Sequence, residues 1–145
     1  MAIKLKETFC NKIVYGDKVI SFLKFIFHIS VFFLIIISLF PGSLLGYFLY
    51  NDLSKQPDLI NNPIGTAINH FIYYFYVSVL GLCLYLKDRN FKKLLYSLFL
   101  LSIALEALQI IIPNRTFEIY DVSANFIGVL FAYTLVKIYK LWSKL

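Results

Sequence analysis

Four long runs of apolar residues alternate with short polar segments along this chain. The runs cover about residues 22–47, 67–86, 94–112 and 122–141, and each is near the ~20 residues that a helix needs to cross about 30 Å of hydrocarbon. Because backbone groups inside a bilayer must bond to one another, each run is expected to be helical. The pattern predicts one all-α domain over residues 1–145, a polytopic membrane protein built as a four-helix transmembrane bundle.

Composition and charge indicate a lipid bilayer as the main partner. Hydrophobic residues make up 60% of the chain and charged residues 15%, a balance typical of membrane proteins. The net charge of +6 does not indicate a nucleic-acid partner, because the cations stand between the apolar runs instead of gathering on one face.

The cations also predict how the chain is oriented. Twelve of the fourteen Lys and Arg residues lie before or at the start of the first run, between the second and third runs, or at the end of the fourth run and beyond it. The two remaining loops carry only Lys55 and Arg115. By the positive-inside rule, both termini are expected to be cytoplasmic.

Proline and glycine separate the predicted helices from their loops. The Pro41-Gly42 pair is expected to end or kink the first helix, and Pro113 to stop the third. Asn62-Pro63 is typical of a helix start. The first twenty residues, mixed apolar and basic, are compatible with a short interfacial helix.

A polar stripe interrupts the third run. Ser102, Glu106 and Gln109 are spaced four and three apart, so they share one helix face. A charged side chain costs about 3 kcal/mol at mid-membrane and usually faces protein or a wet cavity. Glu106 is therefore either a protonated acid that bonds to a neighbouring helix, or part of a functional site. The polar partners available for such a site are Arg115, Gln109, His70 and Asn125.

The fourth run opens with a second polar stripe. Asp121, Asn125 and Gly128 are also spaced four and three apart. Asp121 is either the cap of this helix, where its charge suits the helix dipole, or a member of the same site. Asn125 lies one turn deeper, where an amide commonly bonds across helices, and Gly128 is expected to let another helix approach closely.

Arg115 and His70 complete the candidate site. Arg115 lies between the two acids along the chain, and its planar fork binds a carboxylate or phosphate through two bonds. The alternative is a surface arginine at the level of the lipid head groups. His70 begins the second run beside tyrosines, either as a proton carrier or hydrogen-bond donor or as part of an aromatic belt. His28 has no polar companions and receives no role.

Several kinds of site have no support in the sequence. It contains neither of the glycine-rich nucleotide-binding motifs, G-x-x-x-x-G-K-[ST] and G-x-G-x-x-G. It also contains no H-E-x-x-H or Cys/His grouping for zinc and no G-x-S-x-G elbow. Two carboxylates and one histidine near one membrane face are a weak metal signal. No metal, cofactor or catalytic residue is therefore predicted.

Residues 106–128 resemble the signature of VanZ-like membrane proteins. That family carries Glu-x-x-Gln, then Pro-x-Arg, then Asp-Val-x-x-Asn-x-x-Gly in its last two helices, and all three elements stand here. Residues 70–73 and 38–42 are also similar, so the resemblance covers about residues 38–130. It implies a small multi-pass protein of the bacterial cytoplasmic membrane and cell envelope. The founding member is associated with glycopeptide (teicoplanin) tolerance, and the family has no settled activity.

We therefore expect a non-catalytic envelope protein with an outward-facing polar pocket that binds a polar or anionic, lipid-linked or cell-wall component. Arg115 would contact this ligand, and Glu106 and Asp121 would position Arg115. Further hydrogen bonds would come from Gln109, Asn125 and His70.

Two other functions stay open. One is a membrane-embedded enzyme acting on lipid-linked envelope intermediates, in which Glu106 exchanges protons with Asp121 or His70. The other is a small proton-linked carrier that uses Glu106 as its relay, which would need an oligomer to form a path.

Overall fold

The computed structural model describes residues 17–57, 65 and 67–143, and the described backbone is helical without a strand. Four helices are long and apolar enough to cross a membrane, which confirms the predicted fold class. These are α3 (Asp17–Leu39), α5 (Ala67–Leu84), α6 (Phe91–Leu108) and α7 (Ile119–Trp142). A short helix, α4 (Leu44–Tyr50), and a 3₁₀ turn, η1 (Gln109–Ile111), complete the described elements. The interfacial helix expected before residue 17 and the Asn62-Pro63 helix start lie outside the described residues.

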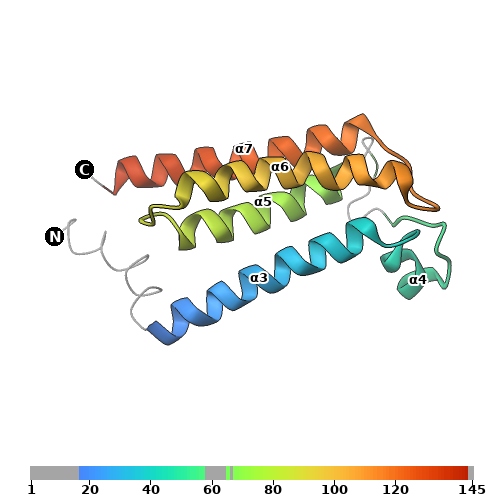
Figure 1. Cartoon of the computed structure of the whole chain (residues 1–145), viewed down its shortest axis with the longest axis horizontal. Helices are drawn as coiled ribbons and strands as arrows, with labels where there is room; N and C mark the ends of the chain where they lie inside the picture. The colour runs from blue at the N-terminus through green and yellow to red at the C-terminus, as the bar shows by residue number, and fades with distance from the viewer. Residues whose placement is uncertain (1–16, 58–64, 66, 144–145) are drawn as a thin grey trace.

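The helices form an up-and-down bundle. Figure 1 shows α5, α6 and α7 side by side, with α3 next to them at an angle. The start of α3, the α5–α6 turn and the end of α7 lie at one end of the bundle, and α4 and the α6–α7 loop lie at the other (Figure 1). The cations, which are unevenly distributed along the sequence, are therefore also unevenly distributed between the two ends of the bundle.

The first membrane helix is shorter than its apolar run. The run extends to about residue 47, but α3 ends at Leu39 because Pro41 cannot continue a helix and Gly42 has a φ of +84°. Ser43 then begins α4, and its Oγ accepts a hydrogen bond from Gly46 N at 2.9 Å. The prediction that the Pro41-Gly42 pair ends this helix is confirmed, and the predicted span was too long.

Apolar side chains divide between the core and the outer surface. The core gathers around Tyr74, Val77, Leu98 and Val129, all at most 2% exposed. Other large apolar side chains cover the outside of every membrane helix, as expected where lipid takes the place of water. Because lipid is as apolar as these side chains, the helices must be held together by close packing and polar contacts.

The closest packing joins α5 to α7. These two helices share the most extensive interhelical contact, and Gly128 lies within it. A Cβ atom at Gly128 would be 2.8 Å from Phe71 O and 3.1 Å from Phe75 N, both main-chain atoms of α5. The prediction that Gly128 permits the close approach of another helix is confirmed.

Replacing Gly128 with valine is expected to destabilise the bundle, because the new side chain would push the α5 backbone away. Overpacking of this kind costs about 1–3 kcal/mol, and the thermal unfolding midpoint in detergent should fall accordingly. Ser123→Val adds a side chain of the same kind on the exposed face of α7 and serves as the matched control. Equal midpoints for the two variants would contradict the close approach.

The charge asymmetry predicts that the α5–α6 turn lies inside the cell and the α6–α7 loop outside. In a protein whose two cysteines are replaced by serine, a new cysteine at exposed Thr116 should react with a membrane-impermeant maleimide on intact cells. A new cysteine at exposed Asn90 should react only after permeabilisation. The reverse pattern would refute this orientation.

Candidate functional site

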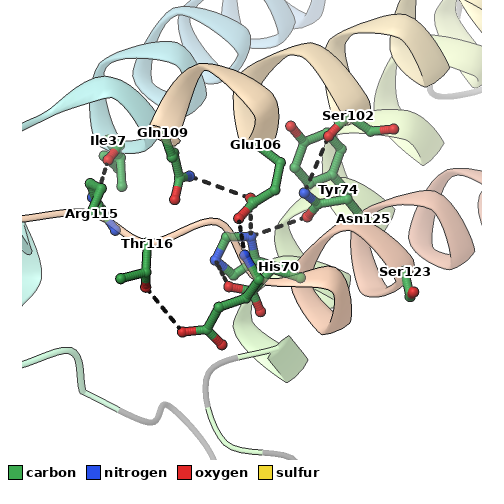
Figure 2. A network of polar contacts seen from close by, with 12 residues as sticks. Ile37, His70, Tyr74, Ser102, Glu106, Gln109, Arg115, Thr116, Ser123 and Asn125 are labelled. Atoms are coloured by element: carbon green, nitrogen blue, oxygen red, sulfur yellow. Dashed lines mark hydrogen bonds and ion pairs between the residues drawn. The ribbon is translucent and has the colours of Figure 1, made fainter. Parts of the chain in front are cut away.

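Three helices bring polar side chains together beneath the α6–α7 loop. His70 lies in the first turns of α5, Glu106 near the end of α6, and Asp121 and Asn125 in the first turns of α7. Gln109 follows α6 in η1 and points to the same place (Figure 2). We refer to these five residues as the polar cluster.

His70 lies between the two acids. Its Nε2 is 3.4 Å from Asp121 Oδ2, and its Nδ1 is 4.0 Å from Glu106 Oε2. Nδ1 is also 3.2 Å from Asn125 Oδ1. An amide oxygen can only accept, so Nδ1 carries a proton and donates it in this hydrogen bond. One side chain of α5 is thereby linked to both of the other helices.

Glu106 is buried but both of its oxygens have donors. Only 1% of the residue is exposed. Gln109 Nε2 donates to Oε2 at 3.4 Å, and the main-chain N–H of Glu118 donates to Oε1 at 3.4 Å. Both bonds are long compared with the usual 2.9–3.0 Å. The carboxylate is therefore held by two weak hydrogen bonds, one from Gln109, directly after α6, and one from Glu118, in the α6–α7 loop.

Asn125 makes the cross-helix bonds predicted for it. Its Nδ2 donates to Ser102 O on α6 at 3.5 Å, while its Oδ1 accepts from His70 on α5 (Figure 2). Ser102 shares the buried face of α6 with Glu106 and Gln109, as predicted from their spacing. The amide of α7 therefore connects all three helices.

Asp121 does not cap α7. The N-cap position is Glu118, which makes no side-chain capping bond, and Asp121 lies in the first turn, where the helix dipole favours its charge. Its Oδ2 faces His70. Its Oδ1 is buried and has no hydrogen-bond partner among the described residues, a condition that costs about 1–3 kcal/mol. The cluster thus contains an acceptor that the described part of the protein leaves unsatisfied.

Arg115 does not bridge the two acids. Within the described residues, the ion pairs of Glu106 and Asp121 are with His70. Partial burial lowers the pKa of the Arg115 guanidinium, and the charges of Glu106 and Asp121 act in the opposite direction. The guanidinium is therefore close enough for the charges of both acids to affect its pKa, and it stays charged. Among the described residues, neither of the two acids that were expected to position Arg115 forms an ion pair with it.

The guanidinium instead binds the end of α3. Arg115 Nη2 donates to Ile37 O at 2.7 Å, and Nε donates to Phe40 O at 3.2 Å. In a continuous helix, Ile37 O would accept from the N–H of residue 41, but Pro41 has none. Arg115 supplies the missing donor, and it ties the α6–α7 loop to α3.

Two residues outside the predicted site also form contacts in the structure. Glu118 was not among the predicted site residues. It donates to Glu106 through its main-chain N–H, a group that does not depend on the side chain, so the sequence could not indicate this bond. His28, to which no role was assigned, lies on α3 with its Nδ1 2.6 Å from Lys24 O.

The arrangement has three chemical capabilities. It can donate and accept hydrogen bonds, and it can move a proton between His70 and an acid. It can also bind a cation, because one donor atom each from His70, Glu106 and Asp121 lie within 4.8 Å of one another. Within the described chain, these three residues are the grouping that could hold a metal ion.

Comparison with known proteins confirms the resemblance carried by residues 106–128. A family model described as VanZ/LLP1 matches residues 25–140, which is most of the chain and includes the whole polar cluster. No curated protein and no solved structure was found to match.

Replacing Arg115 with alanine is expected to lower the free energy of unfolding by about 1.5–3 kcal/mol, the range for hydrogen bonds to charged groups. Pro41→Ala returns an N–H to residue 41, so Arg115→Ala should cost less in that background. Thermal midpoints of the four proteins give the coupling between the two positions. Arg89→Ala, in the exposed α5–α6 turn, is the control. Equal losses in both backgrounds would exclude this role for Arg115.

Proposed function

Since the chain belongs to the VanZ-like family of multi-pass membrane proteins, we propose that it is a non-catalytic protein of the bacterial cell envelope whose polar cluster binds the polar head group of a membrane-embedded component. In this proposal the protein lies in the cytoplasmic membrane with both termini inside, and the cluster opens to the outside. The uneven charge of the two bundle ends supports this orientation. Glycopeptide tolerance, associated with the founding member, is not part of the proposal.

The observation that carries the proposal is the incomplete bonding of a buried polar cluster. Asp121 is 5% exposed, and its Oδ1 has no hydrogen-bond partner among the described residues. A polar group left unsatisfied at membrane depth is costly, so a network with only a structural role is expected to be closed. A hydroxyl, amide or ammonium group of a ligand would provide the missing donor.

The surroundings of the cluster suit an amphiphilic ligand. The His70 side chain is 15% exposed, and the nearby loop exposes Glu118. At the same end of the bundle, Ile110, Ile111 and Ile119 are 66%, 77% and 60% exposed. Acyl or prenyl chains could lie on this apolar surface while their head group reaches the cluster.

Arg115 remains a candidate ligand contact. A guanidinium has five N–H donors, and the bonds to α3 account for two of them. The others could reach a phosphate or carboxylate at the edge of the cluster. The positioning of Arg115 is then due to the carbonyls of Ile37 and Phe40 and not to the two acids.

An acid–base enzyme acting on lipid-linked intermediates is the second candidate. It is favoured by the position of His70, 3.4 Å from one carboxylate and 4.0 Å from the other, which suits proton transfer. Glu106→Gln separates the two functions. With a binding protein, the same amphiphile should co-purify in equal or smaller amount and in unchanged chemical form, whereas an enzyme should lose turnover and co-purify with more of its unconverted substrate.

The binding proposal is tested by photocrosslinking in native membranes. A benzophenone side chain at Tyr120, which is 71% exposed and directly precedes Asp121, should capture an amphiphile that mass spectrometry can identify. The same group at Tyr96, 68% exposed near the other end of the bundle, should capture bulk lipid only. Capture of the same lipids at both positions would count against a head-group site.

Neighbouring substitutions show whether the cluster holds the head group. Gln109→Leu removes a polar cluster side chain and should lower the yield of the specific crosslink several-fold. Leu108→Ala changes the preceding residue, which is 42% exposed, and should leave the yield unchanged. A yield that does not depend on Gln109 would remove this residue from the site.

A further inference from the structure

The two ring nitrogens of His70 face different partners. Asn125 Nδ2 donates to Ser102 O, which turns Asn125 Oδ1 toward His70 Nδ1. Nδ1 therefore holds the ring proton, and Nε2 directs its lone pair at Asp121 Oδ2, 3.4 Å away. Two acceptors that face each other in a buried site repel, unless a cation lies between them.

That cation is either a proton, carried by the ring or by the carboxylate, or a metal ion. Ligand atoms that lie about 2.1 Å from a tetrahedral metal ion are about 3.4 Å from one another. This is the separation of His70 Nε2 and Asp121 Oδ2. One carboxylate oxygen of Glu106, one of Asp121 and one ring nitrogen of His70 lie within 4.8 Å of one another, and Glu106 Oε2 is 4.0 Å from His70 Nδ1. A site at Nε2 therefore needs the Glu106 carboxylate to move closer, and this carboxylate is held only through 3.4 Å bonds.

We propose that His70, Glu106 and Asp121 hold one divalent transition-metal ion of the zinc type. His70 binds it through Nε2, and each acid binds it through one carboxylate oxygen. The buried Oδ1 of Asp121, which has no hydrogen-bond partner among the described residues, is a second observation that points to a ligand here. It also lets Asp121 bind through either oxygen.

Residues outside the three ligands support this assignment. A metal-bound histidine usually donates its other ring N–H to a fixed acceptor, and Asn125 Oδ1 is that acceptor here. Gln109 Nε2 and the Glu118 N–H donate to the two oxygens of the Glu106 carboxylate and keep it directed toward the cluster.

The donor set and the charge select the class of ion. One imidazole nitrogen and two carboxylates suit zinc and its transition-metal neighbours, whereas magnesium and calcium prefer oxygen alone. Two buried carboxylates and one doubly charged cation sum to zero, which removes most of the cost of burying the acids.

The metal would also explain how an acidic cluster binds an anionic ligand. Three protein ligands leave a fourth position open on a tetrahedral ion, and a phosphate oxygen of a head group could occupy it. This step rests on the proposed function, because it takes the cluster as the binding site for that head group.

The test uses the full chain, purified in detergent through a tag without histidine and stripped of metal with a chelator. Titration with Co²⁺ alone should produce a visible absorption band that saturates at one ion per chain and disappears when Zn²⁺ is added. His70→Ala and Asp121→Asn should each weaken binding at least tenfold. His28→Ala, on α3, should leave it unchanged.

Asp121→Asn preserves side-chain volume, so it keeps the test valid if His70→Ala fails to fold. Helix content by circular dichroism verifies folding. No absorption band, or equal affinity in both cluster variants and the parent, would overturn the metal site and leave an imidazolium–carboxylate pair. Loss of the metal site with a specific crosslink at Tyr120 retained would leave the proposed function standing. Metal binding without that crosslink would refute only the proposed function.

Discussion

Gly128 allows main-chain atoms of α5 and α7 to touch, and the polar cluster depends on that contact. The atoms that a side chain at Gly128 would meet belong to Phe71 and Phe75, and His70 directly precedes Phe71 on the same helix. Asn125 stands one turn before Gly128 on α7. With the backbones this close, the short side chains of Asp121 and Asn125 reach the imidazole of His70. A wider separation would disrupt the packing and the cluster together.

Almost every buried polar group in this region has a partner, which follows from the absence of water in hydrocarbon. The end of α3 shows how strictly this holds, because the carbonyl that Pro41 leaves without a donor receives one from Arg115, on a distant loop. Asp121 Oδ1 departs from the rule. Ser78 Oγ is the other such atom among the described residues, but it belongs to a neutral hydroxyl in the middle of α5. An unsatisfied carboxylate oxygen beside a histidine and a second acid is the more informative exception.

The sequence predicted what depends on spacing along one helix. Apolar runs of about 20 residues became membrane helices, and residues three and four apart on α6 and α7 share the buried faces. It did not predict which cation joins the acids. Arg115 stands between them in the sequence, whereas His70 is far from both, and only the packing of α5 brings the histidine to them. The partners that Arg115 does find are carbonyls 75 and 78 residues away, and main-chain groups are not distinguished by residue type.

The α6–α7 loop connects the cluster to α3, and bond lengths indicate which end of it is fixed. Arg115 holds α3 through a charged donor at 2.7 Å, while the N–H of Glu118 reaches Glu106 at 3.4 Å. Charge-assisted bonds are roughly twice as strong as neutral ones, and the longer bond is weaker still. If Glu106 moves toward a ligand, the bond to Glu118 yields before the bond to α3. The acid can therefore adjust to what it binds while the loop and the first membrane helix keep their places.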